Sequence, residues 1–142
     1  MTPLQLKNYF FTNISIRVNP EFNPDRNDVD TGELAVNVSV TPSEQQENLF
    51  QVDLEIKLEP KEDKEIVPYQ IQLVTVGIFE INPEWPKEKI MELLKITGAS
   101  LLYSAAREFL LVTTSRSPWK PLMLPTISFA PTKNRTSHSK NI

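Results

Sequence analysis

Residues 50–58 read FQVDLEIKL, and this stretch decides the fold class because it alternates strictly between apolar and polar side chains. Such alternation is typical of a β-strand with one face against a core and the other in water. Residues 34–40, LAVNVSV, and residues 14–18, ISIRV, repeat the pattern. The sequence therefore predicts three half-buried strands over these ranges.

A fourth strand is predicted over residues 71–81, IQLVTVGIFEI, where both faces are nearly apolar. A strand of this kind is buried on both sides, either between two layers or against another subunit. Because one helix layer covers only one face, we expect a homo-oligomer with Ile71, Leu73 and Thr75 at or near the subunit contact. The segments that join the four strands are too short for crossover helices, so the sheet should be antiparallel.

The proline distribution locates the helices. The chain has 12 prolines, yet none lies between Pro86 and Pro118, and a proline inside a helix costs about 3 kcal/mol or more. We predict a short helix that begins at Pro86 and ends at residues 97–98, Thr-Gly. A longer helix should begin near residues 99–100, with an apolar stripe at helical spacing, formed by Leu102, Ala105, Ala106, Phe109 and Val112.

After the second helix, four prolines within residues 118–131 exclude a helix or a central strand. We expect an extended segment laid over apolar surface. The predicted fold class is therefore α+β: a four-stranded antiparallel sheet followed by two helices, one short and one long, packed on one face.

The 142 residues suffice for one domain, which we place at residues 1–130. Residues 131–142 carry three basic residues and no acid, and we expect a disordered tail, with an anion-binding arm as the alternative. The net charge of −3 argues against a nucleic-acid binder. No apolar run is long enough to insert in a membrane, and residues 1–11 lack a secretory pattern, so we expect a cytoplasmic protein.

The sequence offers little for catalysis. It contains no cysteine, and its one histidine, His138, is the fifth residue from the end. No glycine-rich phosphate loop, dinucleotide fingerprint or zinc-protease motif occurs, and no histidine in the predicted domain could activate a serine. We predict a binding domain that is not an enzyme and needs no metal or cofactor.

Three strings, in order and at matching intervals, resemble SecB, the bacterial export chaperone, and its SecB-like relatives. They are residues 7–20 (KNYFFTNISIRVNP), residues 76–81 (VGIFEI) and residues 101–129 (LLYSAAREFLLVTTSRSPWKPLMLPTISF). The resemblance covers about residues 7–130. It implies a homotetramer that holds unfolded or nascent polypeptides in hydrophobic grooves without ATP and hands preproteins to the SecA motor.

The resemblance also suggests which residues contact such client polypeptides. Leu34, Val36 and Val38 of the second strand correspond to groove-lining positions, with plain core packing as the alternative. Weaker candidates lie in the loop after the first strand and in the segment after the helices: Phe22, Trp119 and Leu122.

The sequence departs from the family where the family contacts SecA. In SecB an acidic sheet surface faces SecA, and the corresponding positions here hold Asn13, Arg17 and Gln72. The basic tail is also unlike the SecA-binding tail of the family, so we expect weak or absent SecA binding. Two alternatives follow: a dedicated chaperone of an antitoxin in a toxin–antitoxin system, and a non-chaperone adaptor with one fixed protein partner.

Overall fold

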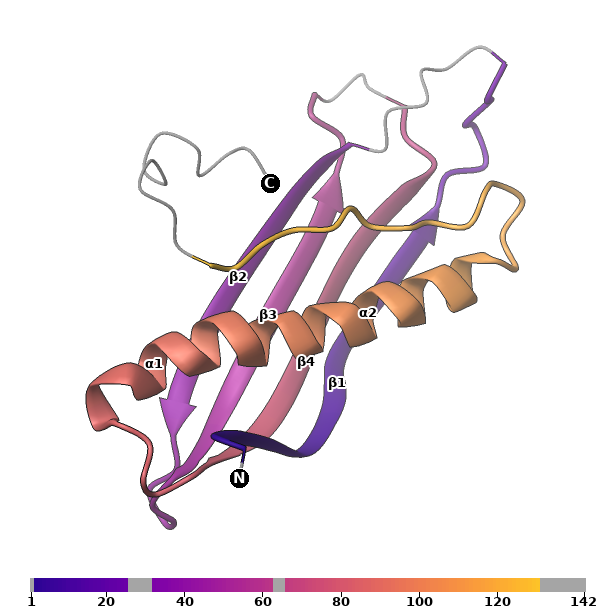
Figure 1. Ribbon diagram of the computed structural model, residues 1–142. Helices are drawn as coiled ribbons and strands as arrows, with labels where there is room; N and C mark the ends of the chain where they lie inside the picture. Colours follow the sequence, from indigo (N-terminus) through magenta and orange to yellow (C-terminus); the bar gives the residue numbers. More distant parts are fainter. Residues whose placement is uncertain (1, 26–31, 63–65, 131–142) are drawn as a thin grey trace.

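A computed structural model, which describes residues 2–25, 32–62 and 66–130, shows a four-stranded antiparallel sheet with one long helix across it (Figure 1). All neighbouring strands are antiparallel and the order is β1-β4-β3-β2, so β1 and β2 form the two edges. The predicted α+β class and antiparallel sheet are confirmed. The strands are β1 (Leu4–Val18), β2 (Glu33–Pro42), β3 (Leu49–Glu59) and β4 (Tyr69–Ile81).

The helical region is one continuous helix, and the prediction of two helices is wrong. It passes without a break through η1 (Lys87–Lys89), α1 (Ile90–Leu93), the π-helical turn η2 (Leu94–Gly98) and α2 (Ala99–Thr114). Gly98, expected to end a helix, has ordinary right-handed helical angles, φ −60° and ψ −47°.

Packing explains why the helix continues through this glycine. Leu94 and Ala99 on either side of it are fully buried, and the buried stripe goes on through Leu102, Ala106 and Leu110. That burial outweighs the cost of about 1 kcal/mol for glycine within a helix. A π-helical turn inserts one extra residue, which keeps the apolar stripes before and after it on the sheet side.

The core lies between the helix and one face of the sheet. Alternate residues of β3 from Val52 to Leu58 are at most 2% exposed, as the period-two pattern predicts. Gly77 of β4 leaves room for two core side chains, because a Cβ atom there would lie 2.7 Å from the Cε2 atom of Phe79 and 2.8 Å from the Cδ2 atom of Leu102.

The predicted subunit-contact residues lie inside this core. Ile71, Leu73 and Thr75 point toward the helix and are at most 2% exposed within a single chain. The sequence predicted apolar side chains on both faces of β4. The face from which it predicted a contact with another subunit is the face that the helix covers within one chain. The face that the helix leaves open carries Val74, Val76 and Ile78.

The chain after the helix forms the predicted extended segment and returns along α2 over the same face of the sheet (Figure 1). Leu122 and Leu124 are buried in the core. The Tyr103 hydroxyl donates to the Pro125 carbonyl at 2.6 Å, and Arg107 Nε donates to the Leu124 carbonyl at 3.0 Å. The predicted tail, residues 131–142, lies outside the described residues.

Among the described residues, no helix is both long enough and apolar enough to cross a membrane.

Candidate functional site

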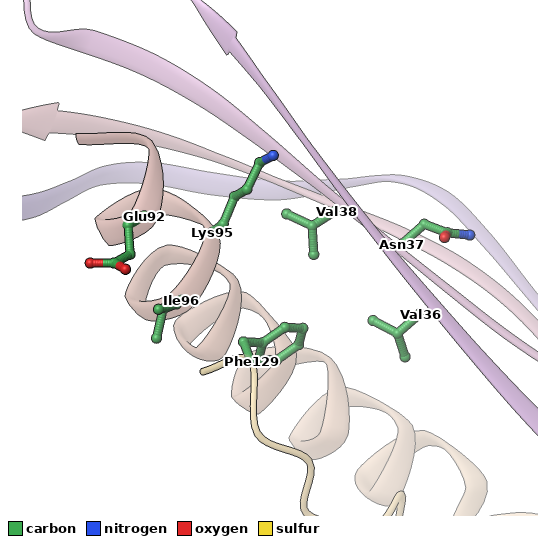
Figure 2. A pocket seen from close by; sticks show the side chains of 7 residues that line it. All are labelled: Val36, Asn37, Val38, Glu92, Lys95, Ile96 and Phe129. Atoms are coloured by element: carbon green, nitrogen blue, oxygen red, sulfur yellow. The ribbon is translucent and has the colours of Figure 1, made fainter. Parts of the chain in front are cut away.

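An open groove runs between edge strand β2 and the first turns of the helix, and we call it the β2–helix groove (Figure 2). Its cavity volume is about 410 Å³. The residues that line it come from β2, from the helix and from the segment that follows the helix: Val36, Asn37, Val38, Glu92, Lys95, Ile96 and Phe129.

Strand β2 forms one wall because its side chains alternate. Val36 and Val38 point from the strand toward the helix, whereas the Asn37 side chain points away (Figure 2). Both valines are half-buried and pack against the core. Each therefore keeps apolar surface that a ligand in the groove can contact.

The π-helical turn supplies the facing wall. Lys95 and Ile96 lie within η2, and the Ile96 carbonyl accepts a hydrogen bond from the Ser100 hydroxyl at 2.6 Å. Such turns are frequent at functional sites because the inserted residue redirects the side chains next to it. Here the insertion places a half-buried isoleucine opposite the β2 valines.

Phe129 lies beside the helix at one end of the groove and is held by an aromatic contact. Its ring lies 5.8 Å from the Tyr103 ring in an edge-to-face arrangement. Burial raises the pKa of the Tyr103 phenol above its ordinary value near 10, and the nearby Arg107 guanidinium partly opposes this rise. The phenol therefore stays protonated at neutral pH and donates its hydrogen bond to Pro125.

The groove is equipped for binding through apolar contacts. Val36, Val38, Ile96 and Phe129 are all half-buried, and the two charged side chains, Glu92 and Lys95, are exposed and of opposite sign. Within the described part of the chain, no cluster of three His, Cys, Asp or Glu residues could hold a metal ion. The arrangement fits an apolar segment without strong net charge.

The structure brings together only some of the residues that the sequence predicted for client contact. Val36 and Val38 line the groove, while Leu34 lies on the same face of β2 but outside the lining. The three weaker candidates lie outside the groove: Phe22, Trp119 and Leu122. Phe22 and Leu122 are 6% and 4% exposed, so they serve packing within one chain.

Trp119 is half-buried and lies next to Phe22, at a ring distance of 5.4 Å. Its indole nitrogen donates to the Asn19 carbonyl at 2.9 Å, which anchors the post-helix segment to the loop after β1. This aromatic pair stabilises the junction of two segments and lies outside the lining of the groove.

Sequence reasoning missed the helical wall and Phe129. Ile96 matched an ordinary apolar helix stripe, and no local pattern signals a π-helical turn that redirects it. Phe129 follows the last proline before residue 130, and its place depends on the chain's return past Tyr103.

The residues from which weak SecA binding was predicted lie on the face of the sheet opposite the groove. Asn13, Arg17 and Gln72 are all exposed, and Arg17 and Gln72 line a shallow depression together with Lys57 and Glu59. This part of the open face carries charges of both signs.

A family profile described as "Preprotein translocase subunit SecB" matches residues 2–136. The "Protein-export protein SecB" of Anaplasma marginale, strain Florida, is 28% identical over 104 residues, which cover 68% of this chain and 59% of that protein. The protein of the same description from strain St. Maries gives the same values. The chain thus spans about three fifths of the length of these curated relatives.

Two solved structures share the fold. The Mycobacterium tuberculosis Rv1957 SecB-like chaperone, in complex with a ChAD peptide from the Rv1956 HigA1 antitoxin, is similar with a TM-score of 0.64 and 18% identity, over 89% of this chain and 88% of that one. A protein of unknown function from Streptococcus agalactiae is similar with a TM-score of 0.50 and 13% identity, over 87% and 97%.

Proposed function

The chain belongs to the SecB family, and on that premise we propose that it is an ATP-independent chaperone that holds non-native polypeptides in the β2–helix groove. It acts in the cytoplasm and neither catalyses a reaction nor needs a cofactor. The observation that carries this proposal is the groove itself, an open channel whose valines, isoleucine and phenylalanine keep part of their apolar surface free.

The physical chemistry of the groove suits many client sequences. Apolar contact is non-directional and contributes about 25 cal/mol per Å² of surface removed from water. An exposed acid and an exposed base, Glu92 and Lys95, impose no strong charge preference on the client. The chain also has no phosphate-binding loop for ATP, as expected for a chaperone that holds clients without turnover.

The test is the suppression of aggregation of several unrelated, chemically unfolded proteins by the full chain without nucleotide. Protection of many clients supports a general holding chaperone. Protection of a few indicates a dedicated chaperone, and protection of none indicates an adaptor and contradicts the proposal.

A dedicated antitoxin chaperone is the second candidate, and the fold match favours it. The Mycobacterium tuberculosis protein that shares this fold is described as bound to an antitoxin peptide. If this chain has the same role, it should bind one antitoxin segment far more tightly than unrelated unfolded proteins. Competition between such a segment and a general client for the groove separates the two functions.

The chaperone is proposed to assemble as a homotetramer. Edge strand β1 exposes large apolar side chains on both faces of the sheet, and α2 exposes others. Large apolar side chains that a single chain leaves in water are often covered in protein contacts. The residues concerned are Leu6, Tyr9, Phe10 and Ile14 of β1 and Leu101 and Val112 of α2. Light scattering that shows a monomer at micromolar concentration would contradict the assembly.

We expect weak or absent binding to a SecA motor. Asn13, Arg17 and Gln72 give the open face no acidic surface at the positions where the family carries one. Titration calorimetry with SecA should show no tight binding. Tight binding that salt abolishes would contradict this expectation and show that other acidic residues on the open face suffice to bind SecA.

A further inference from the structure

Strand β2 is an unprotected edge, and this matters because it also forms a wall of the groove. Within the described residues it pairs only with β3, so the backbone groups on its outer side have no strand partner. Unpaired backbone N–H and C=O groups at a sheet edge readily bind another strand unless a bulge, a charged side chain or a proline blocks its approach.

The two edge strands differ in the features that hinder pairing with a further strand. The β1 ladder has irregularities between Leu6 and Asn8 and between Phe11 and Asn13, which interrupt its pairing. The β2 ladder runs in unbroken register from Glu33 to Pro42. Bulges are a common means of blocking edge-to-edge pairing, and β2 has none.

The composition of β2 also leaves the edge open. Its ten residues, ELAVNVSVTP, contain no lysine or arginine, and the one proline stands at the end. The side chains that point away from the helix between these ends are small: Ala35, Asn37, Ser39 and Thr41. An incoming strand meets no charge repulsion and no bulky obstacle along the middle of β2.

We propose that a client segment in extended conformation adds to the outer edge of β2 as a fifth strand, with alternate side chains in the β2–helix groove. This rests on the proposed function and names its mode of recognition. Main-chain hydrogen bonds supply affinity that does not depend on sequence, and the groove selects apolar residues at every second position. The opposite charges of Glu92 and Lys95 suit a segment without net charge.

The test uses a synthetic peptide that alternates valine with serine, capped at both ends, and the full assembled chain. Two matched peptides carry N-methyl groups on all valines or on all serines. In a strand, N–H groups of alternate residues point to opposite edges, so only one methylated set removes the hydrogen bonds to β2. We expect one methylated peptide to bind at least about tenfold more weakly, since each lost hydrogen bond costs ~1 kcal/mol, and the other to bind as the parent does.

Amide hydrogen exchange locates the contact. Alternate amides of β2 should gain protection when the parent peptide binds. Equal affinities of the two methylated peptides, or unchanged exchange in β2, would overturn strand addition while the groove function stands. Protection of these amides in the peptide-free assembly would also overturn it, because a second copy then occupies the edge. A parent peptide that does not bind at all would contradict the groove function as well.

Discussion

Replacing Val38 with serine should weaken client capture and also lower the stability of the fold, by comparable free energies. Val38 is half-buried, so the smaller part of its surface, roughly 30 Å² of apolar area, remains for a client. At ~25 cal/mol per Å² this area is worth about 0.8 kcal/mol, or about fourfold in affinity. The rest of the side chain packs against the core, and its loss should cost about 1 kcal/mol of unfolding free energy.

Val40 provides a matched control on the same strand and the same face. It is also half-buried and packed against the core, but it does not line the groove. Val40→Ser should therefore cost about the same unfolding free energy as Val38→Ser and leave client capture unchanged.

The comparison needs a thermal melt and an aggregation-suppression assay on each variant. Both variants should melt a few degrees below the parent, by roughly 2–5 °C. Protection of unfolded clients should fall with Val38→Ser and persist with Val40→Ser. Equal loss of protection in the two variants would refute the assignment of Val38 to the groove.

Three further predictions concern stability and assembly. The Thr75 hydroxyl is fully buried without a hydrogen-bond partner, so Thr75→Val should raise the unfolding free energy by about 1 kcal/mol in denaturant titrations; destabilisation would reveal a hidden partner. Burial raises the pKa of Tyr103 in the folded state. The contribution of the protonated phenol to the unfolding free energy should therefore be complete below pH ~10 and decline as the pH rises above that value. Tyr103→Phe should remove this decline. Ile14 is 52% exposed and Leu73 is fully buried, so Ile14→Arg should leave a folded chain that assembles less in light scattering, whereas Leu73→Arg should unfold the chain.

The strands could be predicted from the sequence because burial on one face leaves a local pattern. The alternation in residues 50–58 fixes which side chains of β3 face the core, whatever lies above them. For β4 the pattern fails, because apolar residues on both faces do not reveal which face the helix covers. The subunit contact was therefore assigned to Leu73, which the helix covers within a single chain.

The helix and the groove depend on contacts between distant segments. A glycine after threonine locally favours a helix end, but burial of Leu94 and Ala99 on the sheet continues the helix through Gly98. Val36 and Val38 were proposed from the family resemblance, and the alternation of β2 accounts for their common direction toward the helix. Ile96 and Phe129 were missed because only the π-helical turn and the return of the chain past Tyr103 bring them to β2.

Site-specific photo-crosslinking tests the central claim, that the β2–helix groove holds unfolded polypeptides, most directly. A photoreactive amino acid is placed at Val38, which faces the groove, or at Ser39, whose side chain is exposed on the opposite face of β2. Each variant is irradiated with a chemically unfolded client in the absence of nucleotide. We predict strong client crosslinks from position 38 and few from position 39. Equal crosslinking from both positions, or none from position 38, would contradict the groove as the client site.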